Sequence, residues 1–354
     1  MPRLHRKDEH LYQSLCRVPD RADFSDISFV HNCLPDRDLS EVNLEASYLG
    51  RTFRSPLFIN ALTGGTDLAL KINAALAGVA KDCGLPMAVG SQLAALENAA
   101  VEESFKVVRR INPNGSIWAN IGSYATTSMV QRAVEMITAD AVQIHLNVPQ
   151  ELIMGEGDPR FRGMLDRIAR ITKSVHVPVI AKEVGFGIAR EQALSLIGAG
   201  VDAIDVGGKG GTNFLLIESR RSGKLLSWEL GQWGIPTPIS LVEVLTAAQG
   251  RVDVIAAGGM VSSLDIAKAL ALGANAVGMA GLPVYLLVKK GRAALIRQIK
   301  TIERELRLIM LMVGATSIEQ LQQSPLVITG FCAEWLLRRG IDPSVYALRK
   351  RSEK

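Results

Sequence analysis

The chain has 354 residues, of which 48% are hydrophobic and 21% charged, a globular composition that excludes disorder over most of its length. Lysine and arginine number 40 against 35 acidic residues, and a net charge of +5 on a chain this long does not indicate a nucleic-acid-binding protein. The four cysteines are far apart and form no CxxC pair, which indicates neither a zinc site nor a disulfide framework and favours a reducing compartment.

Residues 1–50 are expected to form an N-terminal extension. The first ten residues are polar and lack the apolar stretch of a signal peptide. The longest apolar run, Ala276–Val288, is interrupted by glycine and proline and is too short to span a bilayer. We therefore expect a cytoplasmic protein without a membrane partner. Arg6, Lys7 and His10 form a cationic cluster, which composition alone would leave as a solvated terminus.

Eight short runs rich in valine, isoleucine and alanine follow, and most begin roughly 25–35 residues apart, the size of a βα unit. Runs that are apolar on both faces and separated by helix-length segments predict buried parallel strands. The eight runs are Leu57–Ala61, Pro86–Val89, Ser116–Ala119, Ala141–Leu146, Val177–Ala181, Ala203–Val206, Val252–Ala256 and Ala276–Met279.

Eight βα units in this length predict a (β/α)8 TIM barrel with an N-terminal extension and C-terminal helices. A doubly wound open sheet is the alternative, but no glycine fingerprint follows the first strand. The long gap after the sixth strand predicts an enlarged loop. We expect one domain, with the barrel over 51–290 and helices and a tail over 291–354. Gly291–Val313 has helical spacing, and a capping box at Thr316 or Ser317 would open a last short helix.

Polar and glycine residues follow each predicted strand, where a barrel enzyme carries its functional groups. The glycines of 207–211 and 258–259 either bind phosphate through bare backbone N–H groups or make tight turns. Lys182 ends an otherwise apolar strand and must reach the barrel mouth or pair with a charge. We expect it to pair with Glu183 or Glu151, or to stabilise negative charge on a cofactor ring.

The segment His145–Glu151, HLNVPQE, is the densest polar cluster. His145 and Asn147 alternate, so both can point inward from the end of a strand. A single glutamate beside a diphosphate suits Mg²⁺, which completes its shell with phosphate oxygens and water. The plainer alternative makes His145 a core residue and Glu151 an acid at a helix start.

Several ordered motifs together show a family resemblance. From Arg6 to about Asp342 the chain resembles the type 2, FMN-dependent isopentenyl-diphosphate delta-isomerases. The motifs that carry the resemblance are RKDEH (6–10), TGG (63–65), GSQ (90–92), HLNVPQE (145–151), KEVGFG (182–187), GGKGGTNF (207–214) and WGIPT (233–237).

The resemblance implies an isomerase of isoprenoid biosynthesis that interconverts isopentenyl and dimethylallyl diphosphate. It implies reduced FMN as the acid and base, NADPH as the reductant, Mg²⁺, and a homo-tetramer or homo-octamer. The partner is a small diphosphate, with no nucleic acid. The alternatives are an FMN-dependent TIM-barrel oxidoreductase with net redox chemistry on another substrate, or a flavin-binding protein without catalysis.

The resemblance also implies roles for individual residues. Gln150, His10 and His145 are the expected catalytic residues, and Glu151 is the expected Mg²⁺ ligand. The expected substrate-binding residues are Arg6, Lys7, His10, Asn147 and Gln150, with Trp233 beside the isoprenyl tail. The expected FMN contacts are Ala61, Leu62, Thr63, Ser91, Asn120, Lys182, Thr212, Gly258, Gly259, Ala280 and Gly281.

The chain departs from the family pattern at three positions. Leu93 and Val261 stand where many members carry arginine, and Leu62 stands where methionine is common. Net redox chemistry is disfavoured, because hydroxy-acid oxidases of this type need a histidine near the seventh and eighth strands. Here no histidine follows His176, and the loop 207–214 lacks the cysteine of the nucleotide dehydrogenases.

Overall fold

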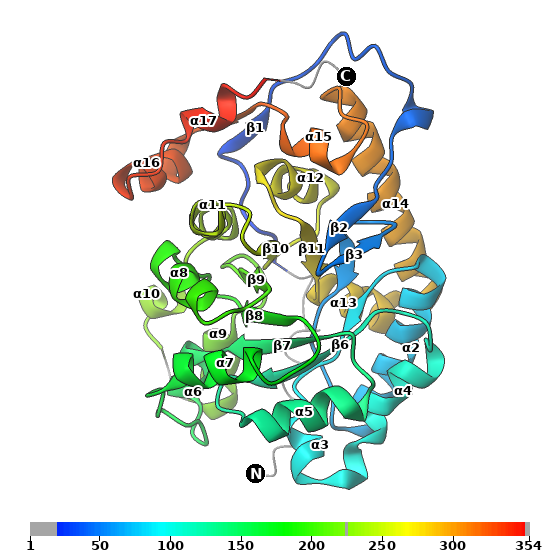
Figure 1. Cartoon of the computed structure of the whole chain (residues 1–354), viewed down its shortest axis with the longest axis vertical. Helices are drawn as coiled ribbons and strands as arrows, with labels where there is room; N and C mark the ends of the chain where they lie inside the picture. Colours follow the sequence, from blue (N-terminus) through cyan, green and yellow to red (C-terminus); the bar gives the residue numbers. More distant parts are fainter. Residues whose placement is uncertain (1–19, 224–225, 351–354) are drawn as a thin grey trace.

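The computed structural model describes residues 20–223 and 226–350, so Arg6, Lys7 and His10 lie outside its described part. Eight parallel strands close into a barrel in the order β10-β11-β4-β5-β6-β7-β8-β9, with helices around it (Figure 1). Each predicted apolar run overlaps one strand, which confirms the (β/α)8 prediction. The strands are β4 (Leu57–Ile59), β5 (Met87–Ala88), β6 (Ile117–Gly122), β7 (Ala141–Leu146), β8 (Val179–Glu183), β9 (Ala203–Asp205), β10 (Asp253–Ala257) and β11 (Ala276–Met279).

Helices connect successive strands on the outside of the barrel. Local signals set their ends: Thr66 caps α2 by accepting from the Ala69 N–H, and Gly84 ends it at φ 63°. The enlarged loop after β9 holds α9 and α10. The helices are α2 (Asp67–Cys83), α3 (Leu93–Glu97), α4 (Glu103–Ile111), α5 (Thr127–Met136), α6 (Val148–Ile153), α7 (Met164–Thr172), α8 (Arg190–Gly198), α9 (Phe214–Ser222), α10 (Trp228–Gly231), α11 (Thr237–Ala248), α12 (Ser263–Leu272) and α13 (Gly281–Lys290), with 3-10 turns at Leu39–Glu41 and Ala99–Val101.

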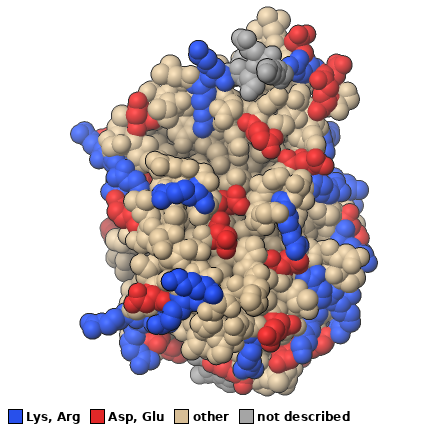
Figure 2. Space-filling model, viewed as in Figure 1, with Lys and Arg blue, Asp and Glu red and all other residues tan. Residues whose placement is uncertain are grey.

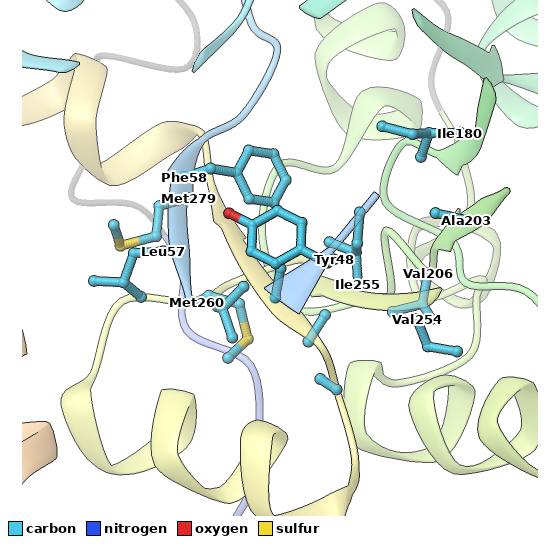
Figure 3. Packing of buried hydrophobic residues seen from close by; sticks show 14 of the residues in the cluster. Tyr48, Leu57, Phe58, Ile180, Ala203, Val206, Val254, Ile255, Met260 and Met279 are labelled. Carbon is cyan, nitrogen blue, oxygen red and sulfur yellow. The ribbon is translucent and has the colours of Figure 1, made fainter. Parts of the chain in front are cut away.

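A hairpin of β2 (Ala46–Tyr48) and β3 (Arg51–Phe53) packs against the N-terminal end of the barrel. The ring of Tyr48 is buried, with its centroid 6.3 Å from that of Trp118 near the start of β6. Figure 3 shows Tyr48 and Phe58 among aliphatic side chains of the barrel strands. Side chains therefore fill this end, and the space for ligands lies at the carboxyl ends of the strands.

The two ends of the described chain meet beside the barrel. β1 (Ile27–Phe29) pairs antiparallel with β12 (Leu326–Ile328). The expected C-terminal helix is α14 (Arg292–Met312), and Ser317 rather than Thr316 caps α15 (Ile318–Gln322). That short helix is not the last, because α16 (Gly330–Arg338) and α17 (Ser344–Ala347) follow β12.

The described surface carries no large field of one sign on the face drawn in Figure 2, where basic and acidic side chains are interspersed. This agrees with the small net charge of the sequence. Within residues 20–223 and 226–350, no helix has the length and apolar character needed to cross a membrane.

Candidate active site

A cavity opens at the carboxyl ends of the strands, and residues after all eight strands line it. Its empty space, including the part open to solvent, is about 1650 Å³.

The cavity brings together most of the site residues predicted from the sequence. Trp233 is not among its lining residues, and its side chain is 62% exposed. Those that line the cavity are Ala61, Leu62, Thr63, Ser91, Asn120, His145, Asn147, Gln150, Glu151, Lys182, Thr212, Gly258, Gly259, Ala280 and Gly281.

One wall of the cavity is built from bare backbone. Gly258 and Gly259 have φ angles of 103° and 74°, which side chains rarely adopt. A Cβ on Gly211 would lie 2.6 Å from the Gly259 nitrogen, so the loops after β9 and β10 touch through their backbones. The N-terminus of α13, at Gly281, faces the same cavity. Close-packed N–H groups beside a helix N-terminus form a site suited to a phosphate group.

Among the described residues that line the cavity, Lys182 on β8 supplies a cation, and its partner differs from both predicted carboxylates. Its Nζ lies 3.0 Å from Oδ2 of Asp205 and donates to the backbone oxygen of Glu183. β8 and β9 are neighbours, and their register places Lys182 opposite Asp205. Asp205 is fully buried, so the ammonium has its counter-charge inside the barrel and presents its remaining surface to the cavity.

Glu183 does not pair with Lys182 because its carboxylate organises the turn after β8. Its Oε2 accepts hydrogen bonds from the N–H groups of Val184, Gly185 and Phe186, at 2.6, 2.7 and 2.6 Å. Burial nevertheless raises the pKa of Glu183 to about 7, since desolvation outweighs these three donors and the nearby ammonium. The residue thus titrates near neutral pH while it shapes one side of the cavity.

The segment 145–151 passes from β7 into α6, which begins at Val148 with Pro149 in its first turn. Glu151 accepts through Oε1 from Asn147 Nδ2 at 2.8 Å and through Oε2 from the Asp158 N–H at 3.0 Å. These donors orient its carboxylate at the cavity wall. The sequence prediction that this segment forms a polar cluster at the barrel mouth agrees with this geometry.

Two buried acids of the site were not predicted. Glu218 on α9 accepts from Gln150 Nε2 at 3.3 Å and from Arg221 Nε at 2.7 Å. Asp205 ends an apolar strand, and a polar residue inside such a run was a signal that could have marked it. Glu218 lies in the enlarged loop, whose path over α6 no sequence pattern specifies.

Two carboxylate residues, Asp20 and Glu151, line the cavity among the described residues. Among the described residues no group of three acidic, histidine or cysteine side chains is arranged to hold a metal. Magnesium often binds through one or two carboxylates, with phosphate oxygens and water as its other ligands. Glu151, whose carboxylate is oriented by two hydrogen bonds at the cavity wall, therefore fits Mg²⁺ as a protein ligand of a metal–diphosphate complex.

Comparisons with known proteins identify the family of the chain. A family model of FMN-dependent dehydrogenases matches residues 150–328. The isopentenyl-diphosphate delta-isomerase of Geobacillus sp. (strain WCH70) is 48% identical over 99% of this chain and 100% of its own. That of Bacillus pumilus (strain SAFR-032) is 45% identical over the full length of both. The chain belongs to the FMN-dependent isopentenyl-diphosphate delta-isomerase family.

Solved structures show the same fold at low identity. A mandelate oxidase variant with an FMN adduct has a TM-score of 0.63 at 19% identity, covering 91% of this chain and 92% of its own. A Pediococcus acidilactici protein named as a lactate oxidase has a TM-score of 0.67 at 17% identity, covering 92% and 95%. They establish the architecture alone.

The cavity of this family member fits FMN. The glycine wall offers backbone donors to a phosphate, and Lys182 offers a cation to an electron-rich ring. Leu93 and Val261, the two positions where the family resemblance leads us to expect arginine in many members, also line the cavity.

Proposed function

We propose that this protein interconverts isopentenyl diphosphate and dimethylallyl diphosphate in isoprenoid biosynthesis, with FMN, Mg²⁺ and NADPH as the reductant. The observation that carries the proposal is the group Asn147, Gln150 and Glu151 at the mouth of a cavity with a glycine wall and a lysine. It suits a substrate with a charged diphosphate and a reactive end beside a flavin. Reduced FMN supplies the acid and base chemistry of the double-bond shift.

The chain's own residues bind and orient the reactants in this proposal. Glu151 holds Mg²⁺ against the diphosphate, and its two hydrogen bonds keep the carboxylate turned toward the cavity. Lys182 stabilises negative charge on the flavin ring, while Asp205 keeps the local charge balanced. Gln150, held by Glu218, faces the cavity and positions the reacting end of the substrate.

Apolar side chains complete the cavity. Leu93, Met154 and Leu282 line it and give the five-carbon tail a surface without competing hydrogen-bond donors. Excluding water matters because water would otherwise react with a cationic centre that develops on the tail. Arg6, Lys7 and His10 remain predicted diphosphate ligands outside the described residues.

Net redox chemistry on another substrate is the second candidate. The shared fold with oxidases favours it in general terms only, since unlike activities share barrel folds. The loops 258–262 and 280–283 after β10 and β11 contain neither histidine nor arginine, so they offer no base or carboxylate-binding cation. The isomerase proposal is therefore preferred.

The experiment is an anaerobic assay for dimethylallyl diphosphate with FMN, NADPH and a titration of Mg²⁺. We expect Glu151→Gln to raise the Mg²⁺ concentration for half-maximal rate at least tenfold. Asp158→Asn is the matched control, because it removes an exposed acid from the same region while the Asp158 N–H still holds Glu151. Wild-type protein that forms no product under any Mg²⁺ concentration would refute the proposal.

A further inference from the structure

A chain of buried hydrogen bonds crosses the barrel interior from Lys182 to His145. It begins at Asp205, whose Oδ2 accepts from Lys182 Nζ at 3.0 Å and from Asn60 Nδ2 at 2.7 Å. Asn60 in turn accepts through Oδ1 from Gln143 Nε2 at 2.9 Å. Asp205 and Gln143 are fully buried and Asn60 is 3% exposed, so water does not substitute for these partners.

The second half of the chain reaches the cavity. Gln143 accepts through Oε1 from Asn120 Nδ2 at 2.8 Å. Oδ1 of Asn120 lies 2.9 Å from Nδ1 of His145. Asn120 and His145 both line the cavity, whereas Gln143 lies beneath them in the barrel.

The direction of this chain is fixed at one end. A carboxylate can only accept, so Asn60 must turn its NH₂ group to Asp205 and its oxygen away. The backbone N–H of Ala61 also donates to that oxygen at 2.8 Å, and a backbone donor cannot be reversed. Two independent contacts therefore fix the Asn60 amide.

Each later amide inherits its orientation from the one before. The Asn60 oxygen requires the NH₂ of Gln143, so Gln143 offers its oxygen to Asn120. The Asn120 NH₂ meets that oxygen, which leaves the Asn120 oxygen for His145. An oxygen needs a donor, so Nδ1 of His145 must carry a proton.

We propose that Gln143 is a positioning residue that transmits the orientation set at Asp205 to His145. Neutral His145 consequently carries its proton on Nδ1, and it takes up and releases protons at Nε2. The opposite tautomer would set the Nδ1 lone pair against the Asn120 oxygen. Reversing the amides instead would break the contacts of Asn60 with Asp205 and Ala61.

The tautomer of His145 follows from the hydrogen bonds alone. A role for Nε2 in proton transfer during catalysis rests on the proposed function. The hydrogen-bond chain assigns His145 a defined acceptor nitrogen when neutral, and an imidazolium that donates from both nitrogens when charged. Lys182 and His145 are the two ends of one hydrogen-bonded unit, so both keep a fixed geometry relative to the barrel.

The test is long-range ¹H–¹⁵N correlation NMR of the FMN-bound protein, without substrate, after labelling the histidine rings. The chain contains five histidines, and a His145→Gln sample identifies the His145 signals by difference. Above the pKa of the ring, we expect Nδ1 to have the shift of a protonated nitrogen and Nε2 that of an unprotonated one. A neutral His145 with its proton on Nε2 would overturn the proposal.

Variants of Gln143 separate positioning from packing. In Gln143→Leu the Asn120 amide loses its fixed orientation, and we expect both tautomers of His145. Gln92→Leu is the matched control, because Gln92 is equally buried but is not part of the hydrogen-bond chain from Lys182 to His145. The substitution removes its hydrogen bonds with the Ala133 carbonyl and the Asn120 N–H. Gln92→Leu should keep the wild-type tautomer. A single Nδ1–H tautomer retained in Gln143→Leu would also overturn the proposal.

A conservative variant covers the case in which Gln143→Leu does not fold. In Gln143→Glu the carboxyl accepts from the Asn120 NH₂ whether it is protonated or ionised, so the Asn120 oxygen still faces Nδ1 of His145 and the wild-type tautomer should persist. Loss of the Nδ1–H tautomer of His145 at every pH would count against the proposed hydrogen-bond chain. Because no substrate is present, failure here leaves the isomerase assay unaffected, and failure of that assay leaves the tautomer result standing.

Discussion

The Lys182–Asp205 ion pair should make a large contribution to folding stability. Asp205→Asn keeps the shape of the side chain but removes its charge beside an ammonium whose side chain is 10% exposed. Removing one member of a buried pair costs about 3–5 kcal/mol, because the other charge stays buried without compensation. One acceptor oxygen is lost as well, so a cost of about 4 kcal/mol or more in the free energy of unfolding is expected.

A double-mutant cycle isolates the pair. Lys182→Met alone leaves the buried Asp205 carboxylate unpaired and should cost a similar amount. The double variant removes both charges, so it should be less destabilised than the sum of the single variants by about 3 kcal/mol. The assay is urea unfolding followed by tryptophan fluorescence, at one pH and one protein concentration and without FMN.

An exposed ion pair provides the control for this cycle. Asp82→Asn breaks the pair with Arg292, whose side chains are 42% and 51% exposed, and should cost less than about 1 kcal/mol. If Asp205→Asn costs no more than Asp82→Asn, the argument from burial is wrong. If the costs of the two single substitutions simply add in the double variant, Lys182 and Asp205 do not stabilise each other.

Three further predictions concern the cavity wall. Because burial raises the pKa of Glu183 from 4.5 to about 7, its contribution to stability is fully present below pH 4.5 and lost as pH rises through 7. Over that pH range the free energy of unfolding of the wild type should fall by on the order of 3 kcal/mol relative to that of Glu183→Gln. A difference in unfolding free energy between the two proteins that does not change with pH would contradict this pKa. Gly259→Ala places a Cβ 2.0 Å from a carbonyl oxygen of the β9 loop and should weaken FMN binding at least tenfold by fluorescence titration. Gly250→Ala has the same φ of 74° without a neighbour within 4 Å, so it should leave FMN affinity unchanged. Glu218→Gln weakens the hold on Gln150 and should lower kcat about tenfold, the equivalent of about 1.4 kcal/mol, with FMN affinity intact. An unchanged kcat would show that the hydrogen bond from Gln150 to Glu218 does not contribute to turnover.

The barrel could be predicted from the sequence because buried parallel strands are apolar on both faces and recur at the spacing of a βα unit. Chemistry at the strand ends followed from the fold, which is why the segment 145–151 and the glycines at 258–259 could be located. Neither carboxylate expected to pair with Lys182 does so: Glu183 adjoins it in the sequence and Glu151 follows β7, whereas the actual partner, Asp205, lies across the sheet on β9. The register of β8 and β9, which brings Asp205 opposite, is set by barrel closure.

Other site residues depend on tertiary structure in a stronger sense. The buried position of Glu218 requires α9 to pack on α6, and nothing in the local pattern of 214–222 specifies that contact. The polar interior chain through Gln143 looks from the sequence like an isolated polar residue in an apolar strand. Trp233 shows the opposite case, since an aromatic residue within a family motif lies 62% exposed and away from the cavity lining.

The product-to-NADPH ratio tests the isomerase proposal most directly. Purified protein is incubated anaerobically with isopentenyl diphosphate, FMN, Mg²⁺ and limiting NADPH, and dimethylallyl diphosphate is quantified against the NADPH consumed. Many product molecules for each NADPH are expected, because isomerisation requires no net electron transfer. One product for each NADPH, or NADPH consumption without product, would contradict an isomerase and indicate net redox chemistry on the same barrel.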